Sequence, residues 1–396
     1  MTSTLDLSAA PLGDCSVEQF MRRHWQRRPL QVRGAFPGWR SPLASDAVRR
    51  LATHDDVQSR LVTAVDGRWR LAHGPFAPTK IPSARRRDWT LLVQGVDRHD
   101  DAVHSLLEPF RFLSDARLDD VMISIAGDGG GVGPHVDSYD VFLIQAEGRR
   151  RWRTGPPPRS AGGAPAFVEG LPLKILADFR PDDEWIAEPG DLLYLPPGWA
   201  HEGVALGPCM TISIGFRAPS RREFLRAWLA ECADDPGGAD PRFGDAGTAA
   251  TTRPAELPSS LVTTLRDWAE RWRPDDARLE RFIGRYLTEP APDVWFDGTM
   301  DADPDVDGER DIDGERDIDD DAPPSAVRLD RRSRAAYRGR DFFLNGECFA
   351  GAASASLKSL ADRRVLRGPL LRRAWDRPAE RALLVDWLRS GWLAQA

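Results

Sequence analysis

Polar and apolar residues alternate, or apolar residues run together, at several places in the first 218 residues. The clearest examples are 119–127 (DDVMISIAG), 140–148 (DVFLIQAEG), 191–195 (DLLYL) and 209–216 (CMTISIGF). Each is bounded on at least one side by glycine or proline. Short runs of this kind between turn residues predict β-strands, with Gly148 marking the end of the strand that contains Val141–Ile144.

The apolar spacing changes to three and four residues after Pro219, which predicts amphipathic helices. These helices are expected at 222–233 (REFLRAWLAECA), 261–272 (LVTTLRDWAERW) and 277–287 (ARLERFIGRYL). Beyond residue 322 the segment FFLNGECFAG predicts a hairpin around Asn345-Gly346, followed by helices in ASLKSLADRRVL and PAERALLVDWLRSGW. We therefore expect a strand-rich region over 1–218, a helical region over 219–299 and a small helix-and-hairpin module over 323–396.

Charge is spread unevenly along the 396 residues, whose formal net charge is -7. Residues 300–322 hold 12 acids and two arginines and include a tandem DGERDID repeat, whereas residues 323–396 hold 15 basic and seven acidic side chains. The repeat imitates the start of a calcium loop, but Gly314 stands at the twelfth position, where a bidentate glutamate is required. We interpret 300–322 as a disordered acidic linker.

No signal peptide and no membrane-spanning segment is indicated by the sequence. The start MTSTLDLSAAPLGD lacks a basic and then apolar stretch, and nowhere do 18 uncharged apolar residues follow one another. The four cysteines are scattered without a C-x-x-C pair, as expected for reduced thiols. These observations favour a cytoplasmic protein of two or three domains, with no general affinity for membranes or nucleic acid.

Three His-x-Asp pairs occur, at His54, His99 and His135, where the composition of seven histidines and 61 acids gives about one His-x-acid pair by chance. The first two pairs lie in polar or helix-like stretches, where solvated or capping side chains are ordinary. His135 follows a glycine-rich turn and precedes a predicted strand. Because side chains alternate along a strand, His135 and Asp137 should project to the same side.

A second histidine, His201, follows the predicted strand 192–195 and the corner PPGW at 196–199. Proline and glycine make this corner rigid, so it can fix a ligand at the start of the next strand. Two histidines and one carboxylate on one face of a metal ion form the site of non-haem Fe(II) oxygenases. We therefore predict that His135, Asp137 and His201 bind Fe(II).

The segments that carry these residues resemble the JmjC-type, cupin-like 2-oxoglutarate oxygenases, and specifically the bacterial ribosomal oxygenases. The resemblance covers 129–153 (GGGVGPHVDSYDVFLIQAEGRRRWR) and 189–205 (PGDLLYLPPGWAHEGVA), and extends to 20–39 and 215–225. It implies a mainly β fold with appended helices: a double-stranded β-helix (jelly-roll or cupin) barrel, a helical dimerisation region and a C-terminal winged-helix-like domain. It does not account for the acidic insertion.

The family's cosubstrate, 2-oxoglutarate, needs a cation for its far carboxylate deeper in the barrel. In GRRRWR, Trp152 should face the apolar interior and Arg150 shares its parity, while Arg149, Arg151 and Arg153 point the other way. Arg150 also matches the position of the family's basic residue. We add Ser124 and Thr211 as hydroxyl partners, although ordinary strand hydroxyls bonded to the backbone are an equal alternative.

Members of the resembled family hydroxylate an arginine of large-subunit ribosomal protein number sixteen. A guanidinium entering a partly dry cleft needs an anionic or aromatic partner, and Asp120 and Tyr139 have the parity to supply it. Such a clamp would bring the arginine β-carbon to the metal. The alternatives are a loop carboxylate bonded to backbone for Asp120 and a packed barrel residue for Tyr139.

Other functions remain open. The same triad could oxidise another protein residue or a small molecule, or the module could be non-catalytic, with a structural metal and an RNA- or protein-binding tail. The helices of 219–299 could form a homodimer, as the resemblance implies, or simply cover the barrel. Likewise the basic tail could contact RNA, or could dock on acidic parts of the same chain.

Overall fold

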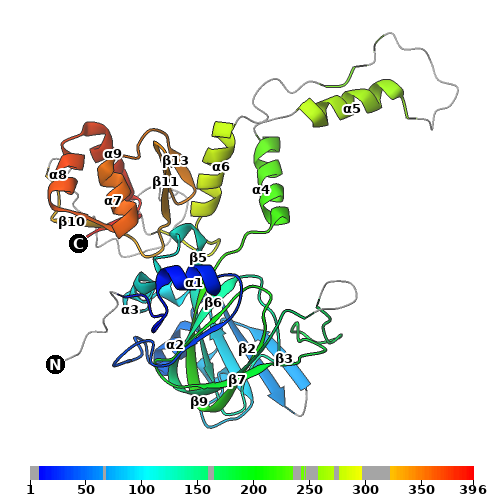
Figure 1. Cartoon of the computed structure of the whole chain (residues 1–396). Coiled ribbons are helices and arrows are strands. Elements are labelled where there is room, and N and C mark those ends of the chain that lie inside the picture. Colours follow the sequence, from blue (N-terminus) through cyan, green and yellow to red (C-terminus); the bar gives the residue numbers. More distant parts are fainter. Residues whose placement is uncertain are drawn as a thin grey trace.

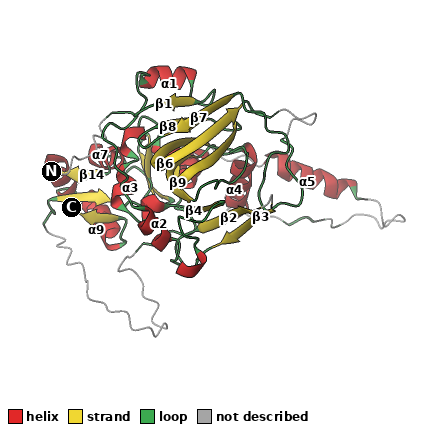
Figure 2. Cartoon of the chain, turned by 90° about the horizontal axis from the view of Figure 1, so that it is seen from below, coloured by secondary structure: helices red, strands yellow, loops and turns green. Residues whose placement is uncertain are grey.

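A nine-stranded antiparallel sheet, folded over on itself, forms most of the N-terminal half of the computed structural model (Figures 1 and 2). The structure describes residues 9–65, 68–158, 165–234, 242–244, 246, 257–271, 276–296 and 322–396. The strand order is β1-β8-β6-β9-β5-β4-β2-β3, with β7 paired to β6. This arrangement confirms the predicted mainly β barrel.

The strands of this sheet have very different lengths, and the two longest, β6 and β9, pair with each other from end to end. Their bounds are β1 Leu30–Val32, β2 Ser59–Val65, β3 Arg68–His73, β4 Trp89–Val93, β5 Leu118–Ala126, β6 Asp140–Gly155, β7 Asp183–Ala187, β8 Leu192–Leu195 and β9 Ala200–Phe216. Short helices cover the outside: α1 Val17–Arg23, α2 Ser45–Leu51 and α3 Asp101–Ser105. Single 3₁₀ turns accompany them: η1 Pro78–Lys80, η2 Val96–Arg98, η3 Glu108–Phe110 and η4 Asp115–Arg117.

Alternate residues of β6 face two separate cores. Phe142 and Ile144 belong to the large cluster that includes Phe20 of α1, whereas Val141 and Leu143 pack with Trp152 inside the barrel. Burial of these apolar side chains on both faces explains why the strand has a continuous apolar run rather than a simple alternation.

Gly148 does not end this strand, contrary to the prediction from sequence. The pairing of β6 with β9 shifts register between Gln145 and Arg149, and β6 then continues to Gly155. Gly148 has a φ of 62°, and a Cβ there would lie 2.2 Å from the Pro208 carbonyl oxygen. The bulge reverses the parity of the strand, so that Val141 and Leu143 before it and Arg150 and Trp152 after it line the same cavity.

The predicted helices of the middle region are α4 Arg221–Asp234, α5 Ser259–Arg271 and α6 Asp276–Thr288. Helix α4 packs on α6 through Trp228 and Phe282, whose ring centroids lie 4.8 Å apart. Helix α5 projects away from the body of the molecule (Figure 1). None of the described helices is long and apolar enough to cross a membrane.

The C-terminal domain contains two three-stranded sheets and three helices around one apolar core. Strands β12 and β13 form the predicted hairpin around Asn345-Gly346, and the predicted helices correspond to α7 and α9. Helix α8 lies between them and was not predicted. The bounds are β10 Ala326–Leu329, β11 Ala335–Arg338, β12 Asp341–Leu344, β13 Glu347–Phe349, α7 Ala355–Arg363, β14 Val365–Arg367, α8 Gly368–Trp375, α9 Pro378–Arg389 and β15 Leu393–Gln395.

Arginines dock this domain on the barrel. Arg334 donates to the Leu118 and Asp119 carbonyl oxygens at 3.3 and 2.6 Å, and Arg331 forms an ion pair with Asp101 at 2.8 Å. In the other direction, Arg111 donates to the Ala361 carbonyl oxygen at 3.2 Å. Part of the basic tail therefore serves intramolecular docking. The predicted linker 300–322 lies, except for Ala322, outside the described residues.

Candidate active site

His135 and His201 lie opposite each other in an isolated antiparallel bridge. Each backbone N–H donates to the other residue's carbonyl oxygen at 2.9 Å. Residues 135–137 do not form the regular strand that was predicted, because β6 begins only at Asp140. Asp137 is instead held by its carbonyl oxygen, which accepts from the Gly198 N–H at 2.7 Å. The corner before His201 therefore positions Asp137 as well.

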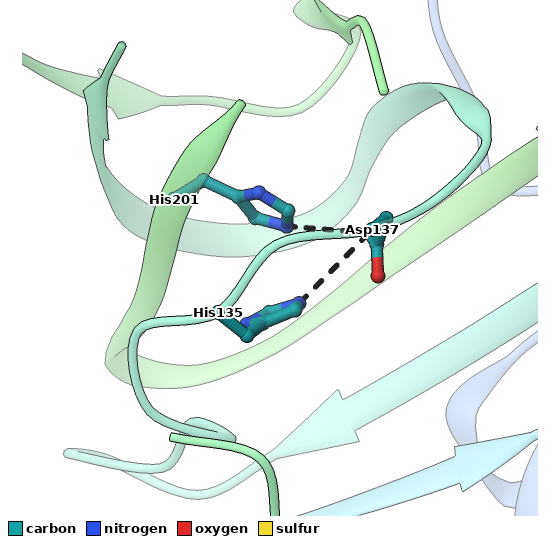
Figure 3. Close-up of side chains that lie close together, drawn as sticks. All are labelled: His135, Asp137 and His201. Carbon is teal, nitrogen blue, oxygen red and sulfur yellow. Dashed lines mark ion pairs between the residues drawn. The ribbon is translucent and has the colours of Figure 1, made fainter. Parts of the chain in front are cut away.

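The three predicted ligands converge on one point (Figure 3). The Asp137 Oδ2 atom lies 3.9 Å from His135 Nε2 and 3.4 Å from His201 Nε2. Ligand atoms held about 2.1 Å from a metal at right angles are about 3 Å apart, so a small inward adjustment would complete the facial set. Among the described residues this is the one group of three His, Cys, Asp or Glu side chains with metal-site spacing, and neither His54 nor His99 belongs to it.

Both histidines are oriented by the same local device. The Nδ1 atom of His135 lies 2.9 Å from the Gly133 carbonyl oxygen, and that of His201 lies 3.0 Å from the Trp199 carbonyl oxygen. A carbonyl partner requires the proton on Nδ1, which leaves the Nε2 lone pair directed at the metal position. Burial, with His135 nearby, lowers the pKa of His201 to about 4, so this imidazole is neutral and ready to coordinate.

A cavity of about 380 Å³ opens beside the triad, and Arg150 lies in its wall. The Arg150 side chain is buried, and its strongest contacts are weak: Ser124 Oγ and Cys209 Sγ both lie 3.5 Å away. Its Nε atom has no hydrogen-bond partner. Among the described residues no carboxylate lies within ion-pair distance of this guanidinium. A buried cation without a counter-ion fits the far carboxylate of a keto acid.

The parity argument is confirmed by burial, because Arg150 and Trp152 are buried while Arg149 is exposed and Arg151 and Arg153 are intermediate. Ser124 and Thr211 also lie in the cavity wall, opposite each other in the β5–β9 pairing. The Thr211 hydroxyl donates to the Gln145 side chain at 3.1 Å, and Ser124 Oγ lies 3.5 Å from the Thr211 carbonyl oxygen. Both hydroxyls keep free lone pairs, and their roles as cosubstrate contacts stay predictions.

The two residues predicted to clamp the substrate differ in position. Tyr139 lines the cavity, and burial and Asp137 raise the pKa of its phenol, which stays protonated. Asp120 does not line the cavity; its Oδ2 accepts from the Gly95 N–H at 2.8 Å and lies 3.9 Å from Arg98. Burial and Asp97 raise the pKa of Asp120 to about 6. One Asp120 oxygen is thus bonded to the backbone, as in the alternative interpretation of this residue. A substrate role for Asp120 stays a prediction.

Several cavity residues were missed from sequence. Thr90 is buried, and its hydroxyl has no hydrogen-bond partner among the described residues; Arg60 also lines the cavity, with an amino nitrogen 4.0 Å from the Met122 sulfur, and Cys209 contacts Arg150 from behind the lining residues. Thr90 and Arg60 enter the site through β4 and β2, which join the sheet beyond β5. The alternation of WTLLV places Thr90 and Leu92 on one face, but nothing in the sequence shows which strand this one pairs with.

Comparison with known proteins identifies two matching family profiles. Residues 105–224 match a JmjC domain, and residues 269–394 match a ROXA-like winged helix. The second match includes α6, which also contacts β11, β12 and β13, and it spans the predicted boundaries at 299 and 322.

Similar proteins are known from bacteria. The chain is 35% identical over 272 residues to ribosomal protein uL16 3-hydroxylase of Escherichia coli. This alignment covers 68% of this chain and 70% of that protein. It is 34% identical over 206 residues to a probable ribosomal oxygenase of Haemophilus influenzae, covering 51% and 50% of the two chains. The solved structure of the E. coli ribosomal oxygenase YcfD with cobalt and 2-oxoglutarate superposes with a TM-score of 0.75 at 30% identity, covering 95% of this chain and 97% of that one.

Proposed function

This chain belongs to the JmjC-type ribosomal oxygenases, and we propose that it 3-hydroxylates an arginine of ribosomal protein uL16. It is a 2-oxoglutarate-dependent dioxygenase that uses Fe(II). The observation that carries the proposal is the placement of a His-Asp-His triad and a buried, unpaired Arg150 in one cavity, in a chain that covers 70% of a uL16 3-hydroxylase.

Each group in the cavity has a distinct task. Bound Fe(II) supplies a centre at which 2-oxoglutarate and oxygen are activated for insertion of one oxygen atom into a C–H bond. His135, Asp137 and His201 would hold the ion through Nε2, Oδ2 and Nε2. Arg150 would bind the far carboxylate of the keto acid, with Ser124 and Thr211 beside it. The apolar walls formed by Val141, Leu143 and Trp152 exclude water from the reacting atoms.

The substrate arginine would enter at the Tyr139 side of the cavity. Tyr139 offers an aromatic face to a guanidinium, and the carboxylate of Asp120 lies near enough to contribute to the raised pKa of the Tyr139 phenol. If these two groups hold the guanidinium at the cavity wall, the aliphatic part of the side chain extends toward the triad. This orientation selects the β-carbon as the site of oxidation.

Mass spectrometry of uL16 isolated from cells with and without this protein tests the proposal. We expect a shift of one oxygen atom on a single arginine, which is lost in Asp137→Ala cells. A peptide carrying that arginine should be a substrate, and its Arg→Lys and Arg→His versions should not. Oxidation of the histidine peptide in preference to the arginine peptide, or an unmodified uL16 in wild-type cells, would refute the proposal. Undiminished activity of Asp120→Ala would remove Asp120 from the clamp.

We also propose that the protein is a homodimer formed through α4 and α5. Leu225 and Leu229 stand one turn apart on α4 and are 43% and 57% exposed, and Leu265 and Trp268 of α5 are 48% and 38% exposed. Large apolar side chains gathered on projecting helices are typical of an interface. Sedimentation should give a dimer for the wild type and a monomer for Leu225→Glu/Leu229→Glu, while Ala230→Glu, elsewhere on the same helix, should stay dimeric. A monomeric wild type would refute the interface.

The protein is assigned to the cytoplasm by its proposed ribosomal substrate. For the C-terminal domain, RNA contact stays a prediction, since Arg331 and Arg334 are already used for docking on the barrel. Exposed Arg372 and Arg373 of α8 are two of the arginines that could provide it. Salt-dependent binding of a short RNA that is lost in Arg372→Gln/Arg373→Gln would support this contact.

A further inference from the structure

A second cavity, of about 420 Å³, lies between the barrel and the C-terminal domain and is separate from the active site. Its barrel side is formed by residues of η2, α3, η4 and the start of β5. Its other side is formed by β10, the loop 331–335 and the turn between α7 and β14, and the end of α6 closes it. The volume is in the range typical of small-molecule sites, and pockets between domains are a common location for them.

The walls of this cavity are strongly basic. Eight arginines line it against four acidic side chains: Arg98, Arg111, Arg328, Arg331, Arg332, Arg334, Arg363 and Arg364 against Asp97, Glu108, Asp115 and Asp119. The chain as a whole has a net charge of -7, whereas residues 323–396 have an excess of basic side chains, and six of the eight arginines come from there. Four of the eight, Arg98, Arg111, Arg331 and Arg332, form ion pairs with carboxylates, so the question is what balances the other four.

Four of these arginines lack a carboxylate partner among the described residues. Arg334 and Arg364 donate to main-chain carbonyl oxygens, which supply no negative charge. Arg328 and Arg363 are exposed at the rim, and no bond to either side chain is found in the described part of the chain. Burial and Arg217 lower the pKa of Arg334 to about 10, although Asp119 and Asp97 act in the opposite direction.

Two further polar atoms in the wall have no hydrogen-bond partner in the part of the chain that the structure describes. Arg98 Nε and His104 Nδ1 are both buried without a hydrogen bond. Burial and Arg364 lower the pKa of His104 to about 4, so its ring is neutral. A buried polar atom without a partner costs free energy, and a ligand that supplies acceptors would remove that cost.

We propose that this cavity binds a small phosphorylated molecule, with phosphoryl oxygens accepting from Arg334, Arg363 and Arg364. Arginines of the loop 331–335 and of the turn after α7 line the cavity together, and the planar fork of a guanidinium matches phosphate oxygens in pairs. The apolar part of the wall, which includes Leu118, Leu287 and Val294, would contact the rest of the ligand. The limited volume suits a nucleotide-sized molecule better than a nucleic-acid strand. This site does not depend on the proposed hydroxylation of uL16.

Calorimetric titration of the full-length holoenzyme, saturated with 2-oxoglutarate, tests the site with ADP, pyrophosphate and sulfate as probes. We expect ADP and pyrophosphate to bind one per chain and sulfate at least tenfold more weakly. Arg328→Gln/Arg363→Gln should weaken ADP binding at least tenfold, because it removes two guanidinium groups from the cavity wall. The fold should be kept, because no bond to either side chain is found among the described residues. The control variant Arg372→Gln/Arg373→Gln changes two exposed arginines of the same domain that lie outside the cavity, and it should leave the affinity for ADP unchanged.

Four outcomes would overturn the proposal. The first is no binding of either phosphorylated probe, and the second is an equal loss of affinity in the Arg372→Gln/Arg373→Gln control. The third is a loss of ADP binding in Arg150→Ala, which would place the probe in the active site. The fourth is binding of a short single-stranded RNA that is weakened by Arg328→Gln/Arg363→Gln while ADP does not bind, because the phosphate would then belong to a polymer.

Discussion

His135 and His201 exchange both of their backbone hydrogen bonds, each at 2.9 Å, so that the main chain itself holds the two imidazoles side by side. Their ring centroids lie 4.2 Å apart. The spacing of the nitrogen ligands is therefore fixed before a metal binds. The carboxylate is the adjustable member, since Asp137 lies in the loop between this bridge and β6.

Replacing Asp137 by alanine should abolish turnover and weaken metal binding more than about 100-fold, because it removes the anionic ligand and not merely a supporting contact. Titration with Co(II), followed by its visible absorption, measures this directly. Asp101→Ala, in one of the two other His-x-Asp pairs, should leave metal binding unchanged. One-to-one binding retained in a His135→Ala/Asp137→Ala/His201→Ala variant would be incompatible with the assigned ligands.

Replacing Arg150 by alanine should raise the KM for 2-oxoglutarate by roughly 10–100-fold and leave Co(II) binding nearly unchanged, because it removes a charge-assisted hydrogen-bonding group that makes no contact with the triad. Steady-state kinetics against 2-oxoglutarate checks the first effect. The matched control is Arg149→Ala, whose side chain is exposed on the same strand. A larger effect in that control would reverse the assignment.

Gly203 should tolerate no side chain. A Cβ there would lie 2.6 Å from the Trp152 ring, which in turn lies 6.2 Å from the His201 ring between centroids. Gly203→Ala should therefore reduce the free energy of unfolding by about 1–3 kcal/mol and lower activity through displacement of Trp152. Chemical denaturation measures the first effect. Gly244→Ala, where nothing lies within 4 Å, should change neither quantity.

His104 should make the protein less stable in mild acid. Its pKa in the folded state is about 4, below the value of about 6.5 expected when unfolded. The unfolded chain takes up the proton first, so stability falls as pH decreases from about 6.5 toward 4. His104→Gln should remove about 1–2 kcal/mol of this loss at pH 5 relative to pH 7.5. Denaturation curves of the wild type and of His104→Gln at the two pH values measure this difference in the free energy of unfolding. An identical pH dependence in the two proteins would contradict the prediction.

Local patterns predicted those parts of the molecule that depend on local chemistry. Strand β8 was predicted to the residue, because Gly190 and Pro196 bound its apolar run. Burial of Arg150 followed from its parity with Trp152. Counting from Val141 instead would have selected Arg149 or Arg151, since the bulge at Gly148 reverses the alternation.

What the sequence could not predict depends on contacts between distant segments. The Gly95 N–H that binds Asp120 comes from a turn 25 residues away. Thr90 reaches the cavity only because β4 pairs with β5, and alternating residues do not specify their pairing partner. Residues 136–137 likewise belong to no strand, because Asp137 is bonded to Gly198 instead of to a neighbouring strand, and the sequence does not show this contact.

Arg334 holds the C-terminal domain to the barrel through the carbonyl oxygens of Leu118 and Asp119, and every amino acid has such an oxygen. This contact therefore tolerates substitutions of the barrel residues and depends on the arginine of the C-terminal domain. Correlated substitutions between the two domains should be scarce at this contact, even though it is a close one. When C-terminal domains are exchanged between relatives that keep this arginine, the side chains at the start of β5 should therefore matter little for this contact.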